Sequence, residues 1–364
     1  MKKAGIFLVF FIALFISIFL LRLNSFSRAI PIATDLEEGD YSNPKGEEDL
    51  RSFIEEHFFM EERSLIRTSF LEENLMATGD EVLSESLAIY MEYSYEKGDG
   101  EAFYEAVEVL RALFIDKEGL IRWKISGAEN RNLKAAINAP VDDLRIIRNL
   151  YLAGQSFEEE GYLLLADELS TALFKHNVRE HRVLTFNDPK ARYAPLVYHD
   201  FLALAIMAER DSRWNRVLRE SLQVTKNQRI SGLPFFYDDY WIEEGIVSLE
   251  EFMVLENLWV FYYLSKVGIK DQEALLWIID SMDRGPILGR YQIEEDRFFG
   301  HESPAIYGVI AKIARIYHDQ ELYLLSMEAL DRMVVKEGAY RGGFVDLLQG
   351  QAYSYDQLVP LLSY

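Results

Sequence analysis

The hydrophobic residues of this chain recur at intervals of three and four from about residue 47 to its end, which is the period of amphipathic α-helices. Examples are "SESLAIYMEYSYE" at 84–96, "VDDLRIIRNLYLAG" at 141–154 and "SLEEFMVLENLWVFYYLSKVG" at 248–268. The first such segment spans 47–71 and the last 355–364, and short Gly, Asp, Asn or Pro stretches separate most of them. The pattern predicts roughly twelve helices and an all-α protein.

Three short segments between the helices have the composition of β-strands: "GLIRWKIS" at 119–126, "HRVLTFND" at 181–188 and "GRYQIEE" at 289–295. Helices in hairpins with longer loops at alternate junctions favour an (α/α)6 toroid of six inner and six outer helices, with short β-hairpins at its mouth. An open helical solenoid is the alternative. In a toroid, the starts of the inner helices and the long loops converge on a concave mouth, where a ligand would bind.

The N-terminus follows a different pattern. Lys2 and Lys3 precede 18 uncharged residues, Ala4 to Leu21, and Arg22 follows. The run is long enough to span a bilayer, and the lysines favour a cytoplasmic N-terminus. We predict a transmembrane anchor at 1–24, a polar tether at 25–46 and one domain at 47–364, which lies outside the cytoplasm. The alternative is a cleaved secretion signal, with "SRA" near Arg28 as a poor cleavage site.

The amino-acid composition of the chain limits the classes of partner that it can bind. Apolar residues make up 49% of the chain and aromatic residues 13%, enough for a sizeable core. The net charge of −22 argues against nucleic acid and against anionic lipid headgroups, so membrane contact is expected through the N-terminal helix only. The absence of cysteine excludes disulfides, thiolate metal sites and a lipid-modified cysteine. The six histidines are scattered without metal-ligand spacing, and no phosphate-binding or dinucleotide motif is present.

One carboxylate, Glu85, lies at the front of the apolar helix in "TGDEVLSESLAIYMEYSYE", residues 78–96. Asp80 or Ser84 can cap this helix, which places Glu85 in its first turn, near the mouth. An acid there is usually an ordinary partner of the helix dipole, which would lower its pKa. A catalytic acid would need burial or a neighbouring carboxylate to raise the pKa again.

Two further acidic stretches are candidates for chemistry. Asp142 and Asp143 begin a strongly apolar, hence inner, helix after Asn138, where they either cap the helix or face the mouth. Asp238 and Asp239 lie in the aromatic segment "SGLPFFYDDYWIEEG" at 231–245. Aromatic rings stack on sugar rings and carboxylates accept hydrogen bonds from hydroxyls. The alternative is a loop that its aromatics hold against the core.

These motifs together resemble the glycoside hydrolases of family 8. That family carries a "SEG" acid at the start of one inner helix and an A-[ST]-D-x-D-L motif about sixty residues later. Here "SES" at 84–86 and "APVDDL" at 139–144 place Glu85 and Asp143 58 residues apart. The hairpin with Trp123, the segment "SGLPFFYDDYW", "ESPAIYGVIAKIARIYHDQELY" at 302–323 and the closing "YSYDQLVPLLSY" follow in the family's order. The resemblance covers roughly 47–364.

The chain departs from the family's pattern at three places. Ser86 stands where the family has glycine, and Val141 stands at the first aspartate of the D-x-D pair, with Asp142 beside it as the substitute. The later Y-[DN]-A-x-R-x-P motif, which supplies the base in many members, reads "SLEEFMVLENL" and keeps neither its Asp nor its Arg; Glu250 and Glu251 are the acids at its start.

The resemblance implies a monomeric, inverting glycosidase that needs no metal or cofactor and acts on a β-linked exopolysaccharide of the bacterial matrix. Glu85 would be the general acid and Asp239 or Asp238 the base, with Glu250 as the alternative. Asp142 and Asp143 would hold sugar hydroxyls. The candidates for stacking on sugars are Trp123, Tyr193, Tyr240, Trp241 and Tyr355.

Two other hypotheses compete with an enzyme. The changed late motif is compatible with a glycan-binding or polymer-export subunit that kept the toroid and lost the base. A helical scaffold for protein partners would explain the acidic surface, but it would not explain the aromatic and carboxylate residues of 231–245. Release of reducing ends from a purified polymer separates the enzyme from both alternatives.

We predict that the segment up to about Leu23 stays attached to the protein, because the apolar run is long and Arg22 follows it directly. Fractionation of cells should find the full-length protein in membranes, with its domain accessible to protease added outside. Predominantly trimmed protein in the medium would contradict the anchor.

Overall fold

The computed structural model describes residues 33–34, 36–60, 65–69, 81–126, 137–188, 190–230, 233, 235–236, 251–348 and 350–364. The chain divides into two units, Met1–Ala33 and Thr34–Tyr364, and the fold described here is that of the second. Among the described residues, no helix combines the length and the apolar character needed to cross a bilayer. The predicted anchor at 1–24 lies outside those residues.

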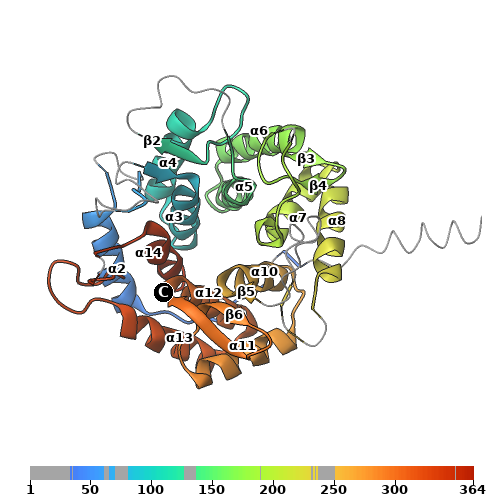
Figure 1. Cartoon of the computed structure of the whole chain (residues 1–364). Coiled ribbons are helices and arrows are strands. Elements are labelled where there is room, and N and C mark those ends of the chain that lie inside the picture. The colour runs from blue at the N-terminus through green and yellow to red at the C-terminus, as the bar shows by residue number, and fades with distance from the viewer. Residues whose placement is uncertain are drawn as a thin grey trace, which may run out of the picture. The chain divides into compact units, whose positions relative to one another are not determined.

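Six helices of the second unit form a closed inner ring (Figure 1). In ring order, each contacting the next, they are α3 (Ser84–Glu96), α5 (Pro140–Ser156), α7 (Phe201–Arg210), α10 (Val254–Lys266), α12 (Pro304–Tyr317) and α14 (Ser354–Leu361). The ring closes because α14, the last helix, packs against α3, the first of the six. This closure is the feature that distinguishes a toroid from an open solenoid.

An outer layer surrounds the ring (Figure 1). Its helices are α2 (Pro44–His57), α4 (Gly100–Val109), α6 (Glu160–Asn177), α8 (Trp214–Asn227), α11 (Gln272–Arg284) and α13 (Gln320–Met333), and α4 continues as a π-helical turn, η1 (Leu110–Phe114). In the described part of the chain, α4, α6, α8 and α13 each pack against the inner helix that precedes them, and α2 packs against α14. The arrangement is the predicted (α/α)6 toroid.

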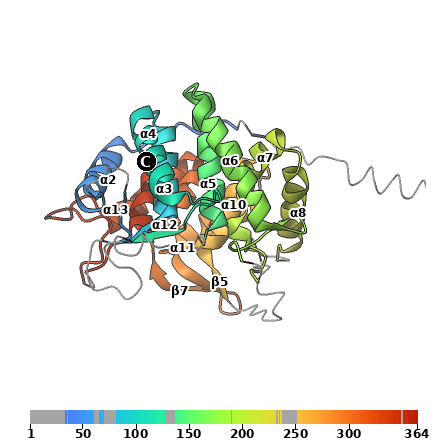
Figure 2. The same ribbon diagram turned by 90° about the horizontal axis from the view of Figure 1, so that it is seen from above.

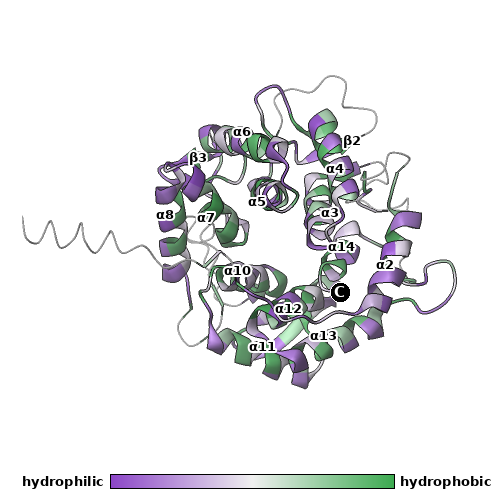
Figure 3. Ribbon diagram, turned by 180° about the vertical axis from the view of Figure 1, so that it is seen from behind, coloured by the Kyte–Doolittle hydropathy of each residue, from purple (hydrophilic) through white to green (hydrophobic). Residues whose placement is uncertain are grey.

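Sequence pattern explains which helices lie in which layer. The outer helix α8 buries residues at intervals of three and four, from Trp214 through Leu218 to Thr225, and exposes the rest. The inner helix α12 buries almost every residue from Pro304 to Ala314, as a helix covered on all sides must. Figure 3 shows hydrophilic residues on the outward sides of outer helices such as α8 and α13.

Short strands precede several inner helices. The strands are β1 (Glu81–Leu83), β2 (Lys124–Ser126), β3 (Val178–Arg179), β4 (Arg182–Val183), β5 (Glu251–Met253), β6 (Leu288–Gln292) and β7 (Arg297–Glu302). β1 pairs with β2, β3 with β4, and β6 with both β5 and β7. β1 and β5 run directly into α3 and α10, and β7 leads through Ser303 into α12. Figure 2 shows β5 and β7 projecting from one end of the ring. The first two predicted β segments contain β2 and β4, and the third overlaps β6, which begins one residue earlier at Leu288.

Two predicted helices are shorter in the structure. The helix expected at 47–71 ends at His57, because Phe59, Arg67 and Ser69 form β-bridges to Ile66, Val82 and Tyr353. The helix expected from Ser248 begins only at Val254, because β5 pairs with β6. In both places strand pairing with distant residues outweighs the local helical period.

The last part of the predicted tether is packed against the ring. Glu38 pairs with Lys266 at 2.5 Å and with Arg315 at 3.7 Å, and the Gly39 N–H donates to the Arg315 carbonyl at 2.7 Å. Asn43 caps α2, and its N–H donates to the Tyr364 carbonyl at 3.0 Å. The folded unit therefore begins before Glu38 rather than at the predicted boundary of Glu47.

Two truncations test this boundary. A chain starting at Thr34 should be a soluble, monomeric, helical protein by circular dichroism and sedimentation. A chain starting at Glu47 should be less stable by about 1–3 kcal/mol, because it leaves Lys266 without the Glu38 carboxylate. Equal unfolding free energies in urea would show that residues 34–46 do not belong to the folded unit. A spectrum dominated by β-structure would contradict the toroid.

Candidate active site

The starts of α3 and α5 are joined by a buried hydrogen bond. The Ser84 hydroxyl donates to Asp142 Oδ2 at 2.6 Å, and the Ser84 N–H donates to the Trp123 carbonyl at 2.9 Å. The predicted capping of α3 by Ser84 is therefore wrong: its hydroxyl reaches across to the next inner helix. Neither α3 nor α5 has a side-chain cap. The acidic side chains at these helix starts are left to interact with one another.

Glu85 follows Ser84 in the first turn of α3 and is half-buried. Burial raises the pKa of its carboxyl group to about 8, the negative charge of Asp142 adds to the rise, Arg145 opposes it, and Asp356 contributes a smaller rise. These effects outweigh the helix dipole, which would lower the pKa. Burial and a neighbouring carboxylate, the two features that the sequence analysis names for a catalytic acid, are thus both present, and the raised pKa favours the protonated form of Glu85 at pH 7.

Asp142 is the ionised partner of Glu85. Its side chain is buried, with 4% of the residue exposed. Burial raises the pKa of Asp142 to about 6, and the Ser84 hydrogen bond and the positive charge of Arg145 limit the rise. Two neighbouring carboxyl groups therefore divide the roles at pH 7, one mostly protonated and the other mostly ionised.

Asp143 is held by a network of asparagines. The Asn138 amide donates to Asp143 Oδ2, and the Asn138 and Asn177 side chains exchange two hydrogen bonds of 3.0 Å. The Asn187 N–H donates to Asn138 Oδ1, also at 3.0 Å. Burial raises the pKa of Asp143 well above its usual range. Within the described residues Asp143 Oδ1 has no hydrogen-bond partner, so it is a buried acceptor that the protein leaves unsatisfied.

A fourth acid, Asp356, comes from the start of α14 and was missed by the sequence analysis. Ser303 donates to its Oδ1 at 2.6 Å, and the hydroxyls of Ser86 and Ser354 lie 2.9 Å apart, joining α14 to α3. Burial raises the pKa of Asp356. The signal available in the sequence was the same as for Glu85, an acid in the first turn of an apolar helix.

Tyr355, a predicted stacking residue, lies beside this group of acids. The negative charge of Glu85 adds to the effect of burial in raising the pKa of Tyr355, and Trp259 Nε1 donates to the Tyr355 hydroxyl at 2.7 Å. A cavity of about 530 Å³ opens next to Asp356 and is lined in addition by His301, Glu302, Pro304, Met333, Phe344, Val345, Asp346, Gln351, Ala352 and Tyr353. Of the four acids at these helix starts, Asp356 is the one that lines this cavity.

Trp123 and Tyr193 differ in their positions. Trp123 is 40% exposed, its backbone is bonded to Ser84, and Lys124 Nζ lies 5.1 Å from its ring centroid. Its ring is therefore available at the rim of the site. The Tyr193 hydroxyl donates to Glu180 at 3.0 Å, and the Arg182 guanidinium lies 3.9 Å from the Tyr193 ring centroid. Within the described residues, Tyr193 belongs to the β3–β4 hairpin rather than to the Glu85 group.

The segment that carries the predicted base is described only at its beginning. Asp238, Asp239, Tyr240, Trp241 and Glu250 all lie outside the described residues. Phe235 stacks on Phe252 at a centroid distance of 5.2 Å, and the Phe236 N–H donates to Asn257 Oδ1 at 2.8 Å. The aromatic residues thus hold the start of this segment against β5 and the first turn of α10.

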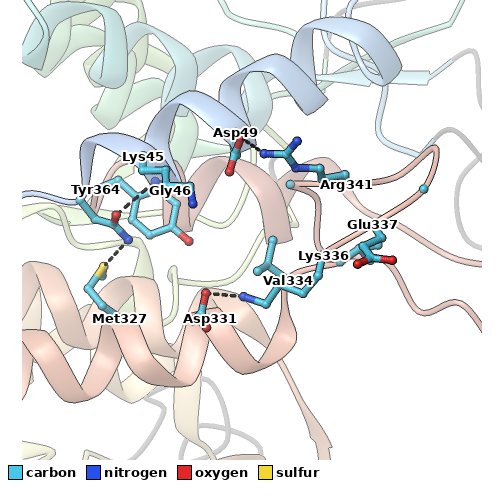
Figure 4. Close-up of a pocket in the computed structure, with 14 residues that line it drawn as sticks. Lys45, Gly46, Asp49, Met327, Asp331, Val334, Lys336, Glu337, Arg341 and Tyr364 are labelled. Atoms are coloured by element: carbon cyan, nitrogen blue, oxygen red, sulfur yellow. Dashed lines mark hydrogen bonds and ion pairs between the residues drawn. The ribbon is translucent and has the colours of Figure 1, made fainter.

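A second cavity of about 530 Å³ lies on the outer wall (Figure 4). Asp49 of α2 and Asp331 of α13 line it and pair there with Arg341 and Lys336. Among the described residues, its lining includes none of the acids at the starts of α3, α5 and α14. The same residues contain no group of three or more His, Asp or Glu side chains placed to hold a metal ion.

Known proteins with a similar sequence or structure were found, although no family model matches the chain. A Bacillus subtilis (strain 168) protein named "Putative lipoprotein YdaJ" is 24% identical over 321 residues, 84% of this chain and 83% of that protein. A structure described as a novel alpha-amylase from Clostridium perfringens has a TM-score of 0.79 and 25% identity, covering 87% of this chain and 96% of that one. The endoglucanase Cel10 from Klebsiella pneumoniae, a family 8 glycosyl hydrolase, has a TM-score of 0.58 and 16% identity, covering 85% and 97%. The chain therefore has the fold of the family 8 glycosyl hydrolases, as its motifs predict.

The raised pKa of Glu85 predicts how the stability of the protein depends on pH. A folded-state pKa of about 8, above the usual value, stabilises the protein at low pH, and this contribution is lost as the pH rises toward 8. The melting temperature of Glu85→Gln minus that of the wild type should therefore increase between about pH 5 and pH 8 and level off above. A difference that does not change with pH, measured by differential scanning fluorimetry, would mean that Glu85 is an ordinary first-turn acid.

Proposed function

We propose that the protein is an inverting glycoside hydrolase with Glu85 as its general acid. The observation that carries the proposal is the buried group of acids where α3 and α5 begin: Ser84 joins the two helices through Asp142, Glu85 follows Ser84 directly, and the pKa of both carboxyls is raised. A proton donor must hold its proton at the working pH and then release it to the glycosidic oxygen, and a pKa near 8 suits that task. The family 8 fold supports this assignment.

The other acids have supporting roles in this proposal. Asp142 and Asp143 accept hydrogen bonds from hydroxyls of the sugar at the cleavage point, and Asp356 extends this set along the adjacent cavity. Asp239 or Asp238 deprotonates the attacking water, with Glu250 as the alternative. The hydrogen bond from Phe236 to Asn257 supports this choice, because it attaches the segment just before these aspartates to the start of an inner helix. Inversion requires about 6.5–9.5 Å between the acid and the base.

The substrate proposed is a β-linked polysaccharide outside the cell. Cel10 is an endoglucanase, and the solved structures with the same fold include an endo-beta-1,4-glucanase from Acetobacter xylinum. The Clostridium perfringens protein is described as an alpha-amylase, so an α-linked glucan belongs in the same assay panel. A bacterial exopolysaccharide is the polymer that an anchored extracellular enzyme meets first.

Attachment to the membrane is proposed through the N-terminal apolar run. YdaJ is named "Putative lipoprotein", and bacterial lipoproteins are attached through a lipid on cysteine. This chain has no cysteine, so that attachment is impossible here, and 18 uncharged residues after two lysines provide a different one.

A glycan-binding or export subunit without turnover is the competing function, because the late motif of the family is changed.

Replacement of Glu85 by glutamine tests the enzyme directly. Glu85→Gln keeps the shape of the side chain and removes the proton, so release of reducing ends from an unactivated β-glucan or exopolysaccharide should fall by about two to four orders of magnitude. The matched control is Glu101→Gln, which changes an exposed carboxylate in the first turn of the outer helix α4. It should leave turnover within about twofold.

Three outcomes separate the hypotheses. Full turnover in Glu85→Gln would remove Glu85 from the chemistry. Glycan binding by the wild type without turnover on either α- or β-linked polymers would favour the non-catalytic subunit. Neither binding nor turnover would favour the scaffold.

A further inference from the structure

Arg145 lies one turn below Asp142 on α5, inside the inner ring, with only 3% of the residue exposed. Its Nη2 donates to the Tyr263 hydroxyl at 2.9 Å, and its guanidinium lies 5.1 Å from the ring centroid of Trp259. Its Nε lies 3.6 Å from Glu92 Oε2, too far for a hydrogen bond. Arg145 is therefore fixed by α10 on one side and by α3 on the other.

The charged groups around Arg145 form two sets. Toward the mouth are Glu85, Asp142 and the hydroxyl of Tyr355, and Arg145 acts electrostatically on all three. Away from the mouth, Glu92 also pairs with Arg148 at 2.5 Å and with Lys312 at 3.2 Å. Among the described residues, Arg145 is the cation that lowers the pKa of both Glu85 and Asp142. Asp356 is a further acid, and its negative charge raises the pKa of Glu85.

Arg145 also differs in its surroundings from the equally buried Arg148, one turn further along α5. Arg148 pairs with Glu92 and with Asp200 at the start of α7. Its charge is balanced within the ring, whereas Glu92 is shared by three cations and balances Arg145 only in part. Within the described residues, Arg145 thus has a share of the Glu92 carboxylate, whereas Arg148 has Asp200 in addition.

We infer that Arg145 is a positioning residue for the reaction, whose buried positive charge, one turn from Asp142 on α5, keeps one negative charge on the Glu85–Asp142 pair. Without this cation, the two carboxyl groups would bind their protons more tightly, Asp142 would become protonated near neutral pH, and Glu85 would release its proton less readily. The inference rests on the proposed function for its consequence in catalysis, and its electrostatic part rests on the burial of Arg145 close to Asp142 on α5.

The activity test is the pH profile of kcat. In the wild type, activity should fall as the pH rises through about 8, where Glu85 loses its proton. In Arg145→Met this alkaline limb should move to higher pH by about 1 unit or more, because an attractive positive charge has been removed. Arg145→Lys keeps the charge and should keep the limb near its wild-type position. Arg148→Met is the matched control, buried on the same helix, and should leave the limb unmoved whatever it costs in stability.

A second measurement does not depend on turnover. The melting-temperature difference caused by Glu85→Gln is followed against pH in the full chain, in Arg145→Met and in Arg148→Met backgrounds. The pH midpoint of this melting-temperature difference should move upward only in the Arg145→Met background. If Arg145→Met does not fold, Arg145→Gln removes the same charge and replaces it in the experiment. An unmoved midpoint, or an equal shift with Arg148→Met, overturns the inference. If the wild type has no activity on any glycan, the proposed function fails, and this midpoint still decides the role of Arg145.

Discussion

The Glu92 carboxylate holds the inner ring together. It lies inside the ring on α3, pairs with Arg145 and Arg148 of α5 and with Lys312 of α12, and Arg148 continues to Asp200 at the start of α7. The pKa of Glu92 is held well below its usual range by these cations, although burial alone would raise it. Removal of one partner from such a buried set costs about 3–5 kcal/mol, so the four helices keep their relative positions.

Alignment of the inner helices is what creates the site. Because α3 and α5 are held side by side below the mouth, their uncapped starts bring Ser84 within 2.6 Å of Asp142, and Glu85 follows directly. The closing contact of α14 with α3 adds Asp356 and Tyr355 to the same group. The ion network and the site share Arg145. Loss of its charge would therefore affect both the packing inside the ring and the proton on Glu85.

The helical period of the sequence predicted the helices and the placement of Glu85, Asp142 and Asp143 at inner-helix starts, but it left a toroid and an open solenoid as alternatives. It could not predict Asp356 or Arg145 as members of the site, because their partners lie 53 residues away for Ser303 and 118 for Tyr263. Helix ends set by strand pairing, such as His57 of α2, were missed for the same reason. The identity of the base stays a prediction, since Asp238 and Asp239 lie outside the described residues.

The account depends on the protonation state of Glu85, which can be measured directly. Carbon-13 NMR of the full-length protein labelled at the glutamate side-chain carboxyl carbons would resolve its titration, with the resonance assigned by its loss in Glu85→Gln. The account predicts a pKa near 8, so that the carboxyl group is still mostly protonated at pH 7. Titration near 4, the behaviour of an exposed glutamate in a helix first turn, would contradict it.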